Sequence, residues 1–118
     1  MASLSFSRTG RTGQSKKYRN IKTVLDGIAF SSKREAARYM ELKLLERVGD
    51  IFELECQPRF TIKINGKLVC HYTADFRYKR GDAIVVEDVK SRPTMTTSYR
   101  LKKRLMDAVH GIVINEVG

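Results

Sequence analysis

The stretch YTADFRYKRGDAIVVEDVKS, residues 72–91, decides the fold that this sequence predicts. It indicates two β-strands joined by a turn at residues 79–82, and the apolar run at residues 84–86 is typical of a strand buried at the centre of a sheet. Alternate residues of a strand point to the same face, so Asp88 and Lys90 project together. A neighbouring strand could bring Asp75 beside them.

Two carboxylates and an ammonium on one sheet edge predict a metal-dependent phosphodiesterase. Asp75 and Asp88 would bind Mg²⁺, and the Val89 carbonyl is a further candidate oxygen ligand. Lys90 would hold the attacking water and stabilise charge on the phosphate. The alternative is that both acids only form surface ion pairs with nearby basic side chains.

A helix is predicted before this segment, in SSKREAARYMELKLLERVGD, residues 31–50. Ser32 and Glu35 have the spacing of a capping box, which starts a helix. Glu35 also has a second predicted role, as a third carboxylate that reaches the metal site. Apolar residues at spacings of three and four predict the buried face of this helix, namely Ala37, Met40, Leu44 and Val48.

The remaining elements are predicted from periodicity and turn signals. Asp26-Gly27 indicates a small hairpin within residues 21–30, and Asn65-Gly66 joins a strand at 60–64 to one that begins at 68 and continues to about 78. Ser98 would cap a second helix at residues 99–110, followed by a short strand at 112–114. Its inner face is predicted to contain Leu101, Leu105, Ala108 and Val109. The order helix, three antiparallel-leaning strands, helix, strand predicts an α/β fold with one domain at residues 21–118.

The charge of the chain favours a polyanionic partner. Twenty-three Lys and Arg against thirteen Asp and Glu give a formal net charge of +10, which favours nucleic acid over a solvated surface or anionic lipid. Residues 1–20 are predicted to form a basic, flexible tail that could lie along a phosphate backbone. Solvation of a helix face is the alternative explanation for the basic residues predicted to contact DNA, which are Lys33, Arg34, Arg38, Arg92, Arg100, Lys102, Lys103 and Arg104.

Composition also argues against other classes of protein. No apolar run approaches the roughly 20 residues needed to span a bilayer, and the first residues lack the apolar centre of a secretory signal. An intracellular, non-membrane protein is therefore expected. Cys56, Cys70, His71 and His110 lack the paired spacing of zinc ligands, so no structural zinc is expected.

Several motifs in a fixed order resemble one nuclease superfamily. DGIAFSSKREAARY, LECQPRF, YTADFRY, VVEDVKS and the basic YRLKKRL follow one another between about residues 17 and 116. Together they resemble the PD-(D/E)XK superfamily, and more narrowly its small phage-encoded members. Two departures are that Ala74 rather than Pro precedes Asp75, and that the second acid is Asp rather than the commoner Glu.

The resemblance implies a restriction-endonuclease-like αβββαβ core, with a mixed sheet flanked by helices. It implies DNA hydrolysis that depends on Mg²⁺, with Mn²⁺ as a substitute. Asp75, Asp88 and Lys90 match the central signature, and Glu35 matches an acid that many members place on the first helix. Gln57 matches a Gln-Pro feature of related nucleases and is a possible accessory residue.

The resemblance further implies a Holliday-junction resolvase that cuts branched DNA as a homodimer during DNA recombination. Two matched nicks across a four-way junction need two active sites related by a two-fold axis. The location would be the cytoplasm of a bacterial host. Alternatives are a nicking or duplex endonuclease of the same fold, a non-catalytic basic DNA-binding protein, and an assembly or anti-host protein that keeps an inactive nuclease fold.

Overall fold

The computed structural model describes residues 22–118, so the predicted basic tail at residues 1–20 lies outside the described part. The chain divides after Ala36 into two units, residues 1–36 and residues 37–118, and each unit is described by itself. Among residues 22–118, no helix has the length and apolar character that crossing a membrane would require.

The first unit contains the predicted hairpin and the start of the first helix. Strands β1 (Thr23–Leu25) and β2 (Ile28–Phe30) pair antiparallel. Asp26 and Gly27 take left-handed backbone angles, with φ of 52° and 77°, as a tight two-residue hairpin turn requires. The hairpin predicted from Asp26-Gly27 is therefore confirmed.

Helix α1 (Lys33–Arg47) begins where the capping pattern predicts. The backbone N–H of Glu35 donates to the Ser32 hydroxyl at 3.2 Å, which satisfies one of the free donors of the first turn. In a capping box the Glu35 carboxylate would accept from the backbone N–H of Ser32. In this structure it accepts a hydrogen bond from the Ser31 hydroxyl instead. One half of the capping box is thus confirmed, and Ser31 supplies the other partner.

The predicted buried face of α1 is wrong. Ala37, Met40, Leu44 and Val48 are all exposed, whereas the buried side chains of this helix are Ala36, Tyr39 and Leu42. The helix carries apolar residues on two faces, and the buried face contains its only aromatic residue. An aromatic ring buries more surface than an aliphatic side chain.

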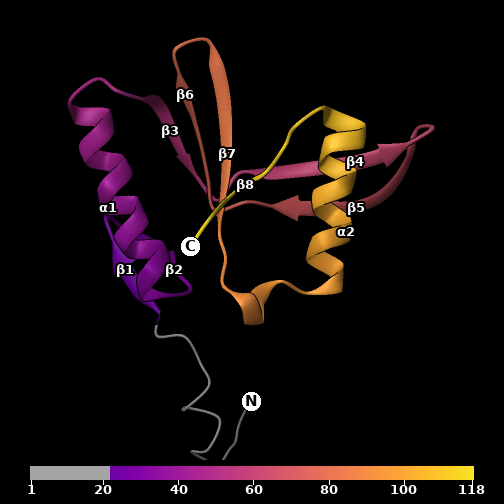
Figure 1. The fold of residues 1–118 in the computed structure, drawn as a ribbon, viewed down its shortest axis with the longest axis horizontal. Coiled ribbons are helices and arrows are strands. Elements are labelled where there is room, and N and C mark those ends of the chain that lie inside the picture. Colours follow the sequence, from indigo (N-terminus) through magenta and orange to yellow (C-terminus); the bar gives the residue numbers. More distant parts are fainter. Residues whose placement is uncertain (1–21) are drawn as a thin grey trace, which may run out of the picture. The chain divides into compact units, whose positions relative to one another are not determined.

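The main sheet of residues 37–118 has four strands in the order β3-β6-β7-β8, as Figure 1 shows. Strands β3 (Phe52–Cys56), β6 (Phe76–Arg80) and β7 (Ala83–Val89) are antiparallel neighbours, and β8 (Asn115–Val117) lies parallel to β7. The α/β class is confirmed as a mixed sheet with two helices. Strand β3 was not predicted; its register with β6 shifts between Phe52 and Glu55, and the left-handed φ of 58° at Glu53 interrupts the strand pattern.

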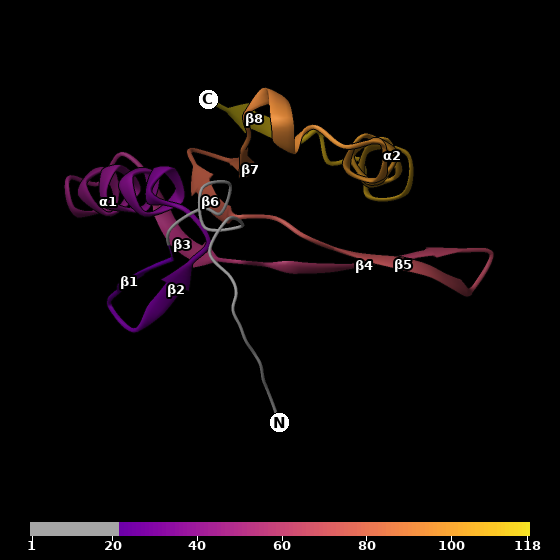
Figure 2. The same cartoon turned by 90° about the horizontal axis from the view of Figure 1, so that it is seen from below.

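Strands β4 (Arg59–Ile64) and β5 (Lys67–Thr73) form a separate two-stranded sheet. This hairpin extends away from the four-stranded sheet (Figure 2). The single strand predicted from residue 68 to about 78 is corrected, because the chain bends at Ala74 and Asp75 between β5 and β6. That bend passes the chain from one sheet to the other.

The second helix begins and ends differently from the prediction. Helix α2 (Thr97–Leu105) is capped by Thr96, whose hydroxyl accepts from the Tyr99 N–H at 3.1 Å, so Ser98 is not the cap. A π-helical turn, η4 (Met106–His110), continues it to Gly111, which takes a left-handed φ of 68°. The final strand lies at β8 rather than at 112–114.

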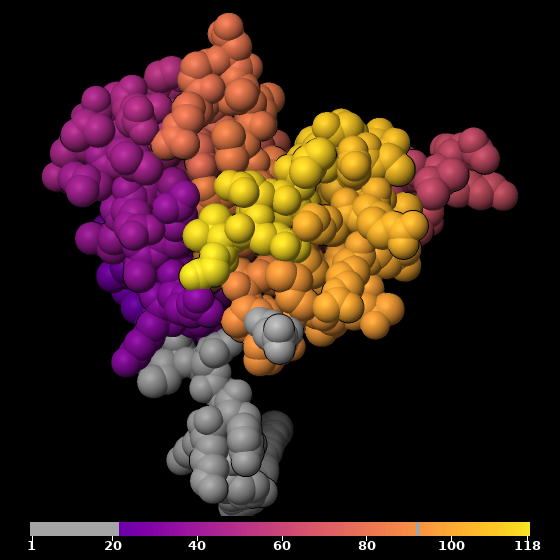
Figure 3. Space-filling model, in the orientation of Figure 1, coloured from indigo at the N-terminus to yellow at the C-terminus, as the bar shows by residue number. Residues whose placement is uncertain are grey.

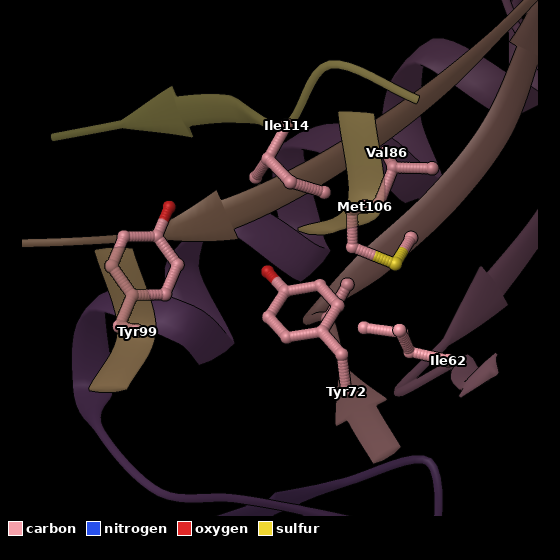
Figure 4. Packing of buried hydrophobic residues seen from close by; sticks show 7 residues of the cluster. Ile62, Tyr72, Val86, Tyr99, Met106 and Ile114 are labelled. Carbon is pink, nitrogen blue, oxygen red and sulfur yellow. The ribbon is translucent and has the colours of Figure 1, made fainter. Parts of the chain in front are cut away.

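The core of residues 37–118 forms between α2, η4 and the strands. Figure 4 shows Tyr72 and Ile62 from the β4–β5 hairpin close to Met106 and Tyr99 from the α2–η4 segment. The inner face predicted for the second helix is therefore largely wrong: Leu101, Ala108 and Val109 are exposed, and only Leu105 packs against the core. The buried members of the cluster are Ile62, Tyr72, Ala74, Val86, Tyr99, Met106 and Ile114.

Candidate functional site

Asp75 and Asp88 lie directly opposite each other on neighbouring chain segments. Phe76 pairs with Glu87 across the antiparallel β6–β7 ladder, so the preceding residue Asp75 faces Asp88, and opposite residues share a face. The Asp75 N–H donates to Asp88 Oδ1 at 3.1 Å, and the Val89 N–H donates to Asp75 Oδ2 at 2.7 Å. These two bonds hold the carboxylates side by side, and Asp88 is only 2% exposed.

The bend at Asp75 is fixed by further backbone bonds. The Asp75 N–H also reaches the Glu87 carbonyl at 3.1 Å, and the Gln57 N–H donates to the Asp75 carbonyl at 2.8 Å. Gln57 takes a left-handed φ of 55°, which an Asn or Gly adopts more readily. The structure therefore gives Gln57 a backbone role in holding Asp75.

Lys90 directly follows β7 and lies two positions after Asp88. Its N–H donates to the Val117 carbonyl at 2.8 Å, which anchors the end of β7 to β8. Its ammonium lies over the ring of Tyr99, with Nζ 4.2 Å from the ring centroid. A cation at this distance is attracted by the negative face of the ring, so Tyr99 orients the Lys90 side chain.

Tyr99 leads to a group of residues that the sequence analysis missed. Its hydroxyl donates to Glu116 Oε2 at 2.7 Å, and the same oxygen lies 3.0 Å from Lys103 Nζ. Glu116 pairs with Asp88 in the parallel β7–β8 ladder. The sequence shows an acid at position 116, but the last strand is predicted to end at residue 114, so Glu116 is not assigned to a strand beside Asp88.

The electrostatics of this group keep Tyr99 neutral and Glu116 charged. Burial raises the pKa of the Tyr99 hydroxyl far above its ordinary value, and its hydrogen bond to Glu116 and the nearby charge of Asp88 add to the rise. The hydrogen bond from Tyr99, followed by that from Lys103, lowers the pKa of Glu116. Tyr99 is therefore a hydrogen-bond donor at neutral pH and not a proton acceptor.

Glu87 points to the opposite face of β7, as its position next to Asp88 requires. Its carboxylate is fully buried and accepts a bidentate pair from Arg38, with Nε to Oε1 at 2.9 Å and Nη2 to Oε2 at 2.7 Å. The Tyr78 hydroxyl donates to the same carboxylate. Burial and this hydrogen bond raise the pKa of Tyr78 to about 12.

Arg38, which the sequence analysis predicts to contact DNA, forms ion pairs within the protein. Its guanidinium is occupied by Glu87 and by Glu41, which accepts from Nη1 at 3.1 Å. The hydrogen bond to Glu87 raises the pKa of Arg38 further above its ordinary value. A buried carboxylate without this partner would be strongly unfavourable. The pairing with Glu87 is therefore sufficient to account for an arginine at position 38.

The other basic residues predicted to bind DNA differ in their surroundings. Lys33 and Arg34 are exposed in the first turn of α1, and Arg100 and Arg104 are exposed on α2, four positions apart on one face. Lys102 is half-buried, and Lys103 is paired with Glu116. Arg92 begins the short 3₁₀ turn η3 (Arg92–Thr94).

The donors at Asp75 and Asp88 fit a hard divalent cation. Within residues 22–118, no group of three or more His, Cys, Asp and Glu side chains is placed to hold one metal ion. Mg²⁺ typically uses only one or two protein carboxylates, with waters and substrate phosphates as its other ligands. Two carboxylates beside the Val89 backbone meet that requirement with oxygen donors alone. Glu35 belongs to the other unit, and its role as a third ligand stays a prediction.

Comparison with known families places the chain without assigning an activity. A family model described as "Protein of unknown function (DUF1064)" matches residues 15–113. This match spans most of the sequence, so the chain belongs to that family. No curated protein and no solved structure matches the chain.

Proposed function

We propose that this protein is a Mg²⁺-dependent DNA endonuclease that hydrolyses phosphodiester bonds and is selective for branched DNA such as Holliday junctions. The observation that carries the proposal is a pair of backbone hydrogen bonds that hold Asp75 and Asp88 next to each other, one from the Asp75 N–H to Asp88 Oδ1 and one from the Val89 N–H to Asp75 Oδ2. The carboxylate oxygens of these two residues are the kind of ligand that Mg²⁺ prefers. The net charge of +10 supports DNA as the substrate.

Asp75, Asp88 and the Val89 carbonyl would hold the cation. The cation would polarise a phosphate oxygen and lower the pKa of a bound water, and Mn²⁺ is expected to substitute for Mg²⁺. The backbone donors keep Asp75 and Asp88 in one geometry before substrate arrives, so little reorganisation is needed during the reaction.

Lys90 would act on the phosphate and the attacking water. Its ammonium can donate to the water oxygen and orient it toward phosphorus, and it can stabilise negative charge that develops on the phosphate oxygens. The Tyr99 ring under the ammonium restricts its position, and Glu116 fixes the Tyr99 hydroxyl. We assign Tyr99 and Glu116 as positioning residues for Lys90.

Two variants of Tyr99 separate its ring from its hydroxyl. Tyr99→Phe keeps the ring face below Lys90, and cleavage is expected to stay within about threefold of wild type. Tyr99→Leu removes the ring face and is expected to lower the cleavage rate about 3- to 30-fold, the equivalent of a cation–π contact. Single-turnover rates measure both, with circular dichroism as the control for folding. Equal loss in both variants would assign the effect to the Glu116 hydrogen bond instead.

Branched DNA as the substrate implies a homodimer, because paired nicks across a junction need two sites related by symmetry. The direct test is cleavage of a labelled four-way junction in competition with a flap and a linear duplex of matched sequence, in Mg²⁺. Paired, symmetric nicks on the junction are expected. Cuts in all three substrates would keep the nuclease and replace the junction preference with a nicking or duplex activity.

The non-catalytic alternatives make a different prediction in the same assay. A basic DNA-binding protein, or an assembly or anti-host protein with an inactive nuclease fold, would bind DNA with strong salt dependence and give no product. The opposed carboxylates of Asp75 and Asp88 favour the enzyme over these alternatives. Two adjacent negative charges would repel the phosphates of DNA, so they do not help a protein that only binds DNA.

A further inference from the structure

The outer half of the β4–β5 hairpin projects from the rest of residues 37–118. Figure 3 shows this segment as a protrusion beyond the body formed by α2 and the C-terminal residues. Every residue from 63 to 69 is exposed, and we call this segment the hairpin tip. The base of the hairpin is anchored, because Ile62 and Tyr72 belong to the core and His110 Nε2 lies 2.9 Å from the Thr61 carbonyl.

The hairpin tip combines exposed apolar side chains with lysines. Ile64, Leu68 and Val69 are 43%, 57% and 50% exposed. A register shift after Ile62 places Lys63 opposite Leu68 and Ile64 opposite Lys67. Opposite residues share a face of the ladder, so each face of the tip presents one lysine beside one large apolar side chain.

The charge of the hairpin is complementary to a polyanion. Residues 57–74 contain no Asp or Glu, and they contain Arg59, Lys63 and Lys67. In contrast, the neighbouring β3 and β6 strands carry ion pairs between Glu55 and Arg77 and between Glu53 and Lys79. The absence of acids on the hairpin favours contact with phosphates.

The hairpin also leads directly into the candidate site. Leu68 lies seven positions before Asp75, and a strand rises about 3.3 Å per residue. The tip therefore lies within about 23 Å of Asp75 along the chain. Base pairs of B-DNA are spaced at 3.4 Å, so this reach corresponds to about seven base pairs.

We propose that the hairpin tip recognises the branch point of DNA, which deepens the proposed function and rests on it for the choice of ligand. Lys63 and Lys67 contact phosphates, and Ile64 and Leu68 contact the faces of unstacked bases. A continuous duplex hides its base faces, whereas apolar side chains insert where stacking is interrupted. The branch would lie within about seven base pairs of the cleaved bond.

The test measures binding without cleavage. Wild-type protein in EDTA is titrated with a four-way junction and with a linear duplex of matched sequence, each carrying 2-aminopurine, whose fluorescence rises when a base is unstacked. Ile64→Ser/Leu68→Ser is compared with Ile84→Ser, a matched control, since Ile84 is 62% exposed at the β6–β7 end. Lys63→Ala/Lys67→Ala tests the charge.

The apolar double variant is expected to lose about tenfold in preference for the junction and to abolish the fluorescence rise at the branch. The lysine double variant is expected to weaken binding to both DNAs and to reduce the salt slope by about two. Ile84→Ser is expected to match wild type.

Three outcomes would overturn the assignment of the tip. The first is that the wild-type protein binds junction and duplex with equal affinity. The second is that Ile64→Ser/Leu68→Ser keeps the wild-type preference for the junction. The third is that this variant loses only self-association, which would make the tip a contact between protein copies. Failure of the nuclease proposal is separate, because it appears as absence of product in Mg²⁺ and leaves the binding result in EDTA intact.

Discussion

Replacing Asp88 with Asn is expected to lower the rate of DNA cleavage about 10³-fold while leaving DNA affinity within a few-fold of wild type. The amide still offers an oxygen to the Asp75 N–H, so the fold around the bend is retained. It removes the negative charge that a divalent cation needs, and metal catalysis supplies several kcal/mol, which corresponds to about three orders of magnitude. Single-turnover cleavage in Mg²⁺ measures the rate, and titration in EDTA measures the affinity.

Asp82→Asn is the matched control for this substitution, because it makes the same change in charge at an exposed turn after β6. It is expected to cleave at the wild-type rate. Asp75→Asn is expected to resemble Asp88→Asn. Cleavage at near wild-type rate in either of these two variants would remove the carboxylate pair from the mechanism.

Replacing Arg38 with Ala is expected to lower the free energy of unfolding by about 3–5 kcal/mol. The substitution leaves the fully buried Glu87 carboxylate without its bidentate partner, and breaking a buried pair from one side has this cost. Chemical denaturation monitored by circular dichroism measures the change. DNA affinity measured where the variant is still folded is expected to match wild type.

Two comparisons identify the cause of the destabilisation. Arg47→Ala removes an exposed Arg from the same helix and is expected to change the free energy of unfolding by less than about 1 kcal/mol. The triple change Arg38→Met/Glu87→Met/Tyr78→Phe removes the whole polar group and is expected to recover most of the stability. A stable Arg38→Ala variant with weakened DNA binding would instead support the predicted contact between Arg38 and DNA.

The opposition of Asp75 and Asp88 could be predicted because it depends on local signals. Asp75 directly precedes β6 and Asp88 lies in β7, two strands joined by a short turn, and antiparallel pairing then fixes which residues face each other. The same alternation along β7 puts Glu87 on the opposite face from Asp88. The bend at Asp75 could not be predicted, since it depends on the backbone of Gln57 and Glu87 rather than on any turn residue.

The helix faces show where a single sequence fails. Helix α1 carries apolar residues on two faces, and periodicity alone cannot determine which of them the rest of the chain covers. Met40 and Leu44 continue a regular pattern but are exposed, whereas Tyr39 and Leu42 are buried. The buried positions of α2 and η4 are Tyr99 and Met106, and the predicted inner face included neither of them.

Glu116, which the sequence analysis missed, and the partner of Arg38 both depend on contacts that are distant in sequence. Glu116 joins the site through a parallel pairing with Asp88, and such pairings carry no turn signal. Arg38 pairs with Glu87 across 49 positions, so its charge was indistinguishable from those of exposed basic residues.

The measurement that tests the central claim most directly is cleavage of a labelled four-way junction by the purified wild-type protein in EDTA, followed by addition of Mg²⁺ in excess of the chelator. The site formed by Asp75, Asp88 and Lys90 predicts no product in EDTA and paired nicks after Mg²⁺ is added, with Mn²⁺ giving the same products. Binding of the junction without any product in either metal would contradict the claim and assign the protein to non-catalytic DNA binding.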